Sequence, residues 1–297
     1  MSITPAPAAS VVIRCRDEVR PLGAVLDAVL AQRDAPPFEV VALDSGSRDG
    51  TLELLARRPV RVEHLAPAAF TYGRALNHGA ALARGELVVY LSAHCPPISP
   101  RWLAALLAPF AEAPVVATFG RQLPVPAVNP IEALATERNF PPTPPAGVRF
   151  STANGAVRRA AVLARPFDEQ VAIAEDHLWA GGVATGERIV YCPAAAVLHS
   201  HPMSLGHWRA RFYAHGRATS YARTRLGVEL PWGGPERAGA VVRGRSGAFL
   251  HLAGTLLRGG ELRALAHLPA YALARTVWYA RGVRDGAREQ RAGDARP

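Results

Sequence analysis

Three short apolar segments of the chain are each followed directly by polar and charged residues. These polar groups are Arg14–Glu18 after Ser10–Ile13, Asp44–Asp49 after Phe38–Leu43, and Ser92–Cys95 after Leu87–Leu91. Guanidinium groups such as those of Arg14 and Arg16 pair well with phosphate. A carboxylate such as that of Asp44 accepts hydrogen bonds from N–H groups, including the N3–H of uracil or thymine. We therefore look for chemistry at these three positions, provided that the fold brings them together.

The apolar segments alternate with helical patterns, which favours an α/β fold with a mostly parallel sheet covered by helices on both faces. One expected helix has Leu22, Val25, Leu26, Val29 and Leu30 on one face. The other expected helices are Thr51–Arg58, Tyr72–Arg84 and Trp102–Phe110. Arg61–Leu65 is expected to be a further strand. A proline-rich passage, Pro124–Pro145, is expected to be an ordered loop, after which Ser151–Arg159 and Ile189–Val197 resume the core pattern. Ligands of such sheets bind beyond the carboxyl ends of the strands, where the three polar groups would meet.

The excess of positive charge is confined to the last third of the chain. The 297 residues carry a net charge of +10, yet residues 1–201 hold 18 arginines and 18 acids, whereas residues 202–297 hold 16 arginines and 6 acids. A hydrophobic content of 49% and a charged content of 20% exclude a disordered or collagen-like chain. Any preference for a polyanion or a membrane must therefore reside in the C-terminal part.

The cysteines and the N-terminus indicate a cytoplasmic protein. Cys15, Cys95 and Cys192 are far apart and have neither the spacing of a disulfide framework nor that of a zinc site. Residues 1–10 lack the basic and apolar regions of a signal peptide. The longest uncharged C-terminal stretches, Ser246–Leu257 and Ala264–Ala274, are too short to span a bilayer.

An ordered series of motifs resembles the family 2 glycosyltransferases, which have the GT-A fold. The motifs are Asp44-Ser45-Gly46-Ser47-Arg48-Asp49-Gly50-Thr51, Asn77-His78-Gly79, Ala83-Arg84-Gly85-Glu86, Leu91-Ser92-Ala93-His94, Glu175-Asp176 and His199-Ser200-His201. Within that family the chain looks most like the rhamnosyltransferase type, because of Gly120-Arg121-Gln122-Leu123-Pro124, Phe167-Asp168-Glu169 and Glu175-Asp176-His177. The resemblance covers about residues 10–205, and the motifs are specific mainly through their order and spacing.

The resemblance implies a nucleotide-sugar site at the ends of the first strands. It gives Asp44 the hydrogen bond to the nucleotide base, although a carboxylate here could instead only cap the turn. The other residues expected to contact the nucleotide, its diphosphate or the sugar are Arg14, Arg16, Glu18, Ser45, Arg74, Ser92, Ala93 and His94. Arg121, Gln122, Asn154 and Gly155 fall where the family frames the donor sugar and the acceptor, and loop geometry is the alternative explanation for them.

The metal-binding motif departs from the family pattern. Members of the family have Asp-x-Asp after the fourth strand, where this chain has Ser92-Ala93-His94. The resemblance matches a third ligand to His199, with His201 as a second possibility. Imidazole suits Mn²⁺ and later metals better than Mg²⁺, so a divalent cofactor, Mn²⁺ or Mg²⁺, would be held by His94, His199 and His201. The alternative is that His94 hydrogen-bonds a phosphate.

Glu175 and Asp176 are the expected catalytic residues. The resemblance gives Asp176 the role of the general base that takes the proton of an acceptor hydroxyl, with Glu175 as the neighbour that could do so instead. The reaction would be an inverting displacement that releases a nucleoside diphosphate. Two carboxylates at a helix N-terminus, favoured there by the helix dipole, are the structural alternative.

The basic C-terminal part is expected to be helical. Between His207 and Arg225, arginines alternate with Trp208, Phe212, Tyr213 and Tyr221, and a pair of amphipathic helices follows. The aromatic residues Tyr271, Trp278 and Tyr279 lie beside Arg275, Arg281, Arg284 and Arg288, as in a helix at a membrane surface. Packing on the catalytic domain is the alternative.

The sequence thus predicts a tail at residues 1–9, a GT-A domain at 10–205, a basic helical extension at 206–283 and a disordered tail at 284–297. We expect an enzyme that moves a sugar from a nucleotide-diphospho-sugar, dTDP-rhamnose or a UDP-sugar, to a hydroxyl of a glycan or lipid-linked acceptor in cell-envelope polysaccharide synthesis. It would be cytoplasmic, with peripheral contact at the inner, anionic membrane face. The alternatives are a non-catalytic nucleotide-sugar-binding relative and, more weakly, a nucleic-acid-binding protein.

Overall fold

The computed structural model describes residues 6–126, 128–144, 149–201, 204–230, 253–258 and 262–294. The chain forms two compact units, which are described separately here. Unit 1 comprises residues 1–123, 139–170 and 175–199, and unit 2 comprises residues 124–138, 171–174 and 200–297. Unit 1 ends at residue 199, whereas the sequence predicts a catalytic domain to residue 205, and two segments within the predicted range, 124–138 and 171–174, belong to unit 2.

Unit 1 is built on a seven-stranded sheet of order β3-β2-β1-β4-β6-β5-β7. The strands are β1 (Ala9–Cys15), β2 (Phe38–Asp44), β3 (Arg61–His64), β4 (Leu87–Ser92), β5 (Val115–Leu123), β6 (Asn154–Arg158) and β7 (Arg188–Leu198). All neighbours in the sheet are parallel except the two that involve β6, which runs antiparallel to β4 and to β5. The predicted α/β fold with a mostly parallel sheet is confirmed.

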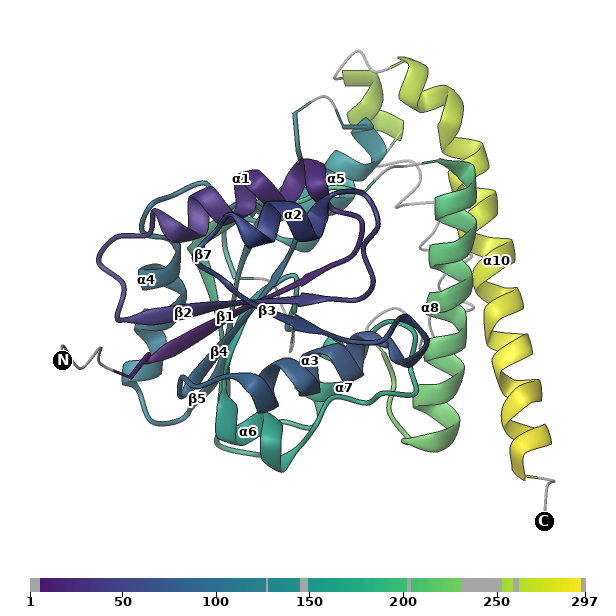
Figure 1. Cartoon of the computed structure of the whole chain (residues 1–297). Helices are drawn as coiled ribbons and strands as arrows, with labels where there is room; N and C mark the ends of the chain where they lie inside the picture. The colour runs from purple at the N-terminus through teal and green to yellow at the C-terminus, as the bar shows by residue number, and fades with distance from the viewer. Residues whose placement is uncertain are drawn as a thin grey trace, which may run out of the picture. The chain divides into compact units, whose positions relative to one another are not determined.

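Helices cover both faces of this sheet, as the apolar patterns predict (Figure 1). They are α1 (Val19–Leu30), α2 (Thr51–Ala56), α3 (Tyr72–Leu82), α4 (Trp102–Leu107), α6 (Arg159–Ala164) and α7 (Glu175–Gly181), with 3₁₀ turns at Pro67–Ala69 and Ala108–Ala111. Side chains of α1, α2 and α4 share one buried cluster with Val11 and Ile13 of β1. Those of α3, α6 and α7 share another with Val12. Successive residues of β1 thus point into opposite halves of the core.

Unit 2 is helical in its described part. It contains α5 (Pro130–Asn139, apart from its last residue), α8 (Leu205–Arg225), a short helix at residues 253–258 and α10 (Leu262–Asp294). Helices α8 and α10 run side by side (Figure 1). Their backbones approach closely at two glycines: a Cβ on Gly216 would lie 2.1 Å from the carbonyl oxygen of Tyr279, and one on Gly282 would lie 2.1 Å from that of Tyr213. Trp208, Leu256, Leu268 and Ala274 form the buried cluster with Ile131 of α5.

Two expectations for the C-terminal part and the proline-rich passage are wrong. The passage at Pro124–Pro145 contains α5, because Pro130 is tolerated in the first turn of a helix and Asn129 caps it by accepting from the backbone N–H of Ile131 at 2.8 Å. Arg284 is not the start of a disordered tail, because α10 continues to Asp294 and its Glu289 pairs with Arg217 of α8. Phe249 and Leu252, which were expected to begin the amphipathic pair, lie outside the described residues. None of the helices in the described part of the chain combines the length and hydrophobicity that crossing a bilayer requires.

Candidate active site

The carboxyl ends of β1, β2 and β4 bring the three predicted polar groups to one edge of the sheet. In the register of the sheet, Cys15 lies beside Asp44 of β2, and Arg14 lies beside Ser92 of β4. The loop before β6 joins the same edge, since the backbone N–H of Ser92 donates to the carbonyl oxygen of Ala153 at 3.1 Å. The expectation that parallel topology gathers these residues is confirmed.

Asp44 orders the turn that follows β2. Its carboxylate is 1% exposed and accepts from the backbone N–H of Gly46 at 2.8 Å and from both the N–H and the hydroxyl of Ser47. Ser45 is also buried, and its hydroxyl donates to the carbonyl oxygen of Cys15 at 3.3 Å. Asp49 separately accepts from the N–H of Thr51 at 3.0 Å. The Asp44 carboxylate therefore caps this turn, and its contact with a nucleotide base stays a prediction.

Arg14 is a half-buried cation, and two of its guanidinium nitrogens make no hydrogen bond to the described residues. One Nη2 hydrogen bond reaches the carbonyl oxygen of Thr152 at 3.3 Å, and the guanidinium carbon lies 5.4 Å from the centre of the Tyr72 ring. The Nε and Nη1 atoms are buried and donate to no acceptor among the described residues. Because buried donors strongly favour a partner, this guanidinium is suited to an anionic ligand.

The other two predicted arginines of this edge differ from Arg14. Arg16 is exposed to solvent. Arg74 is also exposed, and its guanidinium is paired with the carboxylate of Glu169 at 2.7 Å and donates to the carbonyl oxygen of Ala69 at 3.2 Å. A ligand phosphate would have to compete with Glu169 for Arg74, so Arg14 is the better placed of the three.

The acidic pair lies in the first turn of α7, where Thr152 connects it to Arg14. The Thr152 hydroxyl donates to Oε1 of Glu175 at 3.3 Å, and its backbone N–H hydrogen-bonds the carboxylate of Asp176. Asp176 also accepts from the N–H of His177 at 2.8 Å. The carbonyl oxygen of Thr152 accepts from Arg14. The hydroxyl, the backbone N–H and the carbonyl oxygen of this one residue therefore each bind a charged side chain.

Burial raises the pKa of both carboxyl groups above their ordinary values. For Glu175, which is 5% exposed, the neighbouring charge of Asp176 raises the pKa further, whereas the Arg14 guanidinium lowers it. For half-buried Asp176, the backbone hydrogen bonds and Arg14 offset part of the effect of burial. A raised pKa makes a carboxylate a stronger base, which is the property expected of a group that removes a proton from a hydroxyl.

His94 and His199 face each other at the end of β4 and of β7. Their ring centroids are 5.3 Å apart, and they have ring nitrogens within 4.8 Å of one another. Nδ1 of His94 lies 2.9 Å from a carboxylate oxygen of Glu18, and Nδ1 of His199 lies 2.5 Å from the amide oxygen of Gln122. Because an ionised carboxylate and an amide oxygen accept hydrogen bonds, the Nδ1 atom of each ring is the donor in these contacts, and Nε2 is the atom that a neutral ring would offer to a metal.

This arrangement fits a metal ion chemically. Metal-binding imidazoles commonly donate their other N–H to a carboxylate or carbonyl oxygen, which fixes the ring and its tautomer. Glu18, predicted to contact the nucleotide, here holds His94, and Gln122 holds His199 while its own amide nitrogen donates to the Ser151 hydroxyl at 2.9 Å. His201 is two residues beyond His199 and belongs to unit 2.

The remaining predicted residues divide into core and edge positions. Asn154 is fully buried: its oxygen accepts from the Trp102 indole at 2.9 Å and its nitrogen donates to the carbonyl oxygens of Ala195 and Arg121. Gly155 lets its strand pack on Phe150, since a Cβ would lie 2.8 Å from that ring. Asn154 and Gly155 therefore lie in the core as part of strand β6 rather than in a loop, and their contact with a donor or acceptor sugar stays a prediction. Ala93 is also buried.

Sequence reasoning missed Thr152 and Tyr72. Thr152 lies two residues before Asn154, which the resemblance assigns to the sugar site, but no spacing rule shows that one residue reaches Arg14, Glu175 and Asp176. Tyr72 begins α3 and packs under Arg14. A lone tyrosine after a turn carries no sequence signal for this contact.

Solved structures with a similar arrangement of helices and strands identify the fold. The mannosyltransferase PcManGT from Pyrobaculum calidifontis, solved with GDP-Man and Mn²⁺, superposes with a TM-score of 0.58 at 21% identity, covering 92% of this chain and 88% of that chain. Mannosyl-3-phosphoglycerate synthase from Rubrobacter xylanophilus gives a TM-score of 0.54 at 20% identity, covering 77% and 79%. The fold is therefore that of the GT-A glycosyltransferases.

The sequence comparison identifies the family. Residues 10–165 match the model of glycosyl transferase family 2, and the chain belongs to that family. It is 28% identical over 180 residues to the O-antigen chain rhamnosyltransferase WbaN of Salmonella anatum, covering 56% of this chain and 57% of the relative. The chain thus spans little more than half the length of this curated relative.

Proposed function

We propose that this protein is an inverting glycosyltransferase that moves a sugar from a nucleotide-diphospho-sugar to a hydroxyl group of a glycan or lipid-linked acceptor. The observation that supports it best is the buried acidic pair that Thr152 connects to Arg14 at the carboxyl edge of the sheet. A carboxylate with a raised pKa, which can accept a proton, and a cation with unused donors are the two groups that such a transfer needs. Similarity to an O-antigen chain rhamnosyltransferase supports dTDP-rhamnose as the donor, with a UDP-sugar as the second choice.

In the proposed reaction, the carboxylate of Asp176 accepts the proton of the acceptor hydroxyl. The hydroxyl oxygen forms a bond to the anomeric carbon as the bond from that carbon to the diphosphate oxygen breaks, and the configuration inverts. The bonding electrons leave with the nucleoside diphosphate. The Nε and Nη1 donors of Arg14 stabilise the negative charge that develops on the diphosphate. Glu175 is the second candidate for the base, after Asp176. The turn held by Asp44 and Ser45 receives the base of the nucleotide.

The proposed cofactor is a divalent metal held by the Nε2 atoms of His94 and His199. The preset tautomers of these two rings support it, and so does the Mn²⁺ in the PcManGT complex. His201 is the proposed third ligand, because two peptide units keep its Cα within about 7 Å of that of His199. When bound, the metal would neutralise charge on the diphosphate. Two imidazoles favour Mn²⁺ over Mg²⁺.

A cytoplasmic site of action, with the enzyme at the inner face of the membrane, is part of the proposal. A lipid-linked acceptor would lie in the membrane, which supports a site of action at its surface. The second candidate function is a nucleotide-sugar-binding protein without transferase activity, which the replacement of Asp-x-Asp by Ser92-Ala93-His94 favours.

The variant Asp176→Asn tests the proposal. It keeps the size of the side chain but removes the base, so we expect loss of transfer and of donor hydrolysis with nearly unchanged affinity for the donor. Asp34→Asn is the matched control, because the Asp34 side chain is 61% exposed and pairs with the exposed Arg101. Turnover by the wild type with any of a panel of nucleotide sugars excludes the binding-only alternative, and full activity of Asp176→Asn refutes the assignment of the base.

A further inference from the structure

Helix α10 presents an exposed face that changes from apolar to basic along its length. Leu262, Leu273 and Val277 are 68%, 65% and 48% exposed, and their spacing of eleven and four residues places them on one side of the helix. The same side continues, at steps of three and four residues, with the exposed arginines Arg281, Arg284, Arg288 and Arg291. Large apolar side chains in a row on an otherwise exposed helix indicate a binding surface.

The described acidic side chains in this half of α10 interact with α8. Asp285 accepts from the hydroxyl of Tyr213 at 3.3 Å, and Glu289 pairs with Arg217. Asp285 also lies 3.5 Å from Arg281 and from Arg284, so one carboxylate serves two guanidinium groups. The outer face of α10 therefore keeps an excess of positive charge.

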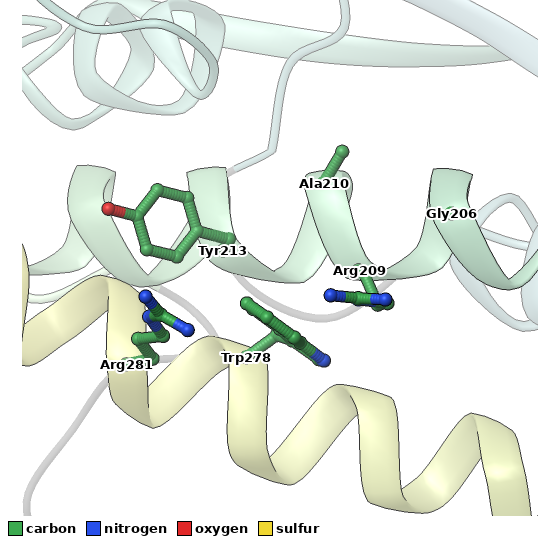
Figure 2. Close-up of a pocket in the computed structure, with 6 residues that line it drawn as sticks. All are labelled: Gly206, Arg209, Ala210, Tyr213, Trp278 and Arg281. Atoms are coloured by element: carbon green, nitrogen blue, oxygen red, sulfur yellow. The ribbon is translucent and has the colours of Figure 1, made fainter.

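A cleft of about 360 Å³ lies between α8 and α10 beside this face (Figure 2). Its lining residues are Gly206, Arg209, Ala210, Tyr213, Trp278 and Arg281. Figure 2 shows the Trp278 ring of α10 between Arg209, which comes from α8, and Arg281. The guanidinium carbons lie 4.2 Å and 5.1 Å from the centre of the ring.

The indole ring prepares these two guanidinium groups for an anion. Stacking on a ring restricts the motion of an arginine side chain, so less conformational entropy is lost when a ligand binds. Two cations held by one ring also repel each other, and an anion that enters the cleft beside the ring reduces that repulsion. A phosphate group, which accepts bidentate hydrogen bonds from guanidinium, is the anion that fits best.

We propose that this cleft binds the phosphate group of an anionic phospholipid, while Leu273 and Val277 enter the bilayer next to it. Arg281 connects the two features, because it lines the cleft and follows Val277 by one helical turn. A soluble phosphate compound would use the arginines but leave the leucine and valine side chains in water. A second copy of the chain would bring its own arginines to this face, whereas an anionic bilayer supplies both acyl chains and negative charge.

Two of the three aromatic residues that the sequence assigns to a membrane surface, Tyr271 and Tyr279, contact other side chains of unit 2. Tyr271 packs edge-on against Trp208, with ring centroids 4.9 Å apart, and the hydroxyl of Tyr279 lies 3.1 Å from that of Thr219. The contact with lipid is therefore assigned to aliphatic side chains and arginines. It extends the proposed membrane contact, but it depends only on residues of unit 2.

Co-sedimentation of the full chain with vesicles tests the proposal. We expect binding to phosphatidylcholine vesicles that contain phosphatidylglycerol, little binding to phosphatidylcholine alone, and weaker binding at high salt. The double variant Arg209→Gln/Arg281→Gln should lose about 30-fold in affinity, since each arginine at an anionic surface contributes roughly fivefold. The matched control Arg101→Gln/Arg188→Gln removes two exposed arginines of unit 1 and should change affinity little.

A second variant tests the apolar part without altering charge. Leu273→Ser/Val277→Ser should also weaken vesicle binding, whereas Ile98→Ser/Leu163→Ser, at exposed apolar positions of unit 1, should not. Circular dichroism confirms that each variant is folded. Equal binding to both kinds of vesicle, equal losses in the control variants, or abolition of vesicle binding by millimolar glycerol phosphate would overturn the proposal. So would a dimer that Leu273→Ser/Val277→Ser dissociates, or an RNA that binds with the same arginine dependence while vesicles do not. Donor turnover is measured separately, so failure here leaves the proposed reaction intact.

Discussion

The variant Thr152→Val removes one hydrogen bond and keeps the shape of the side chain. The hydroxyl of Thr152 donates to buried Glu175 at 3.3 Å, whereas the contacts to Asp176 and Arg14 use its backbone and remain. A hydrogen bond to a charged group contributes about 1.5–3 kcal/mol, and a length of 3.3 Å places this one at the lower limit. About 1.4 kcal/mol corresponds to one pKa unit, so we expect the pKa of Glu175 to rise by about one unit.

Stability as a function of pH measures this shift directly. The pKa of Glu175 in the folded state lies above its unfolded value, so this residue contributes stability at low pH that is lost as the pH rises. Thr152→Val should deepen that loss, and urea unfolding should show about 1.4 kcal/mol more destabilisation at about pH 9 than at about pH 5. Thr152→Ser, which restores a hydroxyl, should behave like the wild type. The same destabilisation at both pH values would refute the assigned interaction.

Three further predictions follow from the geometry. Because burial raises the pKa of Asp176, and a base must be ionised, the rate of transfer should fall as the pH falls through a value above the ordinary range for aspartate, as a pH profile of kcat/KM would reveal; a limb near pH 4 would contradict this. Gln122→Leu removes the acceptor for His199 and should weaken Mn²⁺ binding at least tenfold in a titration followed by electron paramagnetic resonance, with unchanged affinity as the opposing result. Gly216→Ala places a Cβ 2.1 Å from the carbonyl oxygen of Tyr279 and should destabilise the α8–α10 pair by about 1–3 kcal/mol in urea, whereas Gly206→Ala, whose Cβ would lie 3.8 Å from the Ser204 hydroxyl, should not.

The sheet was predictable because its strands are apolar and its turns are polar. The segments ending at Ile13, Leu43 and Leu91 need burial on both faces, and a parallel sheet provides it. The strand β5 is harder to predict, because the small and polar residues in Val115–Leu123 weaken the apolar pattern that marks a buried strand. Helix α5 is not predicted from the sequence, because the prolines on both sides of it are typical of a loop.

Side-chain roles were less predictable than positions. Asp44 was placed correctly at the end of β2, but a sequence cannot tell which of several neighbouring carboxylates and hydroxyls will take the backbone N–H groups of a turn. Asn154 carries an amide that could bind a ligand, but this amide is hydrogen-bonded to the Trp102 indole and to the carbonyl oxygens of Arg121 and Ala195. Both outcomes depend on contacts between segments far apart in the chain, which local patterns do not encode.

The contacts of Thr152 differ in how they respond to genetic change. Its N–H and its carbonyl oxygen belong to the main chain, so a residue other than proline that fits this buried position can still hold Asp176 and Arg14. Only the contact with Glu175 depends on the side chain. Substitutions at position 152 would therefore adjust the acidity of one carboxyl group while leaving its neighbour in place, which offers evolution a single control over the proton affinity of the site.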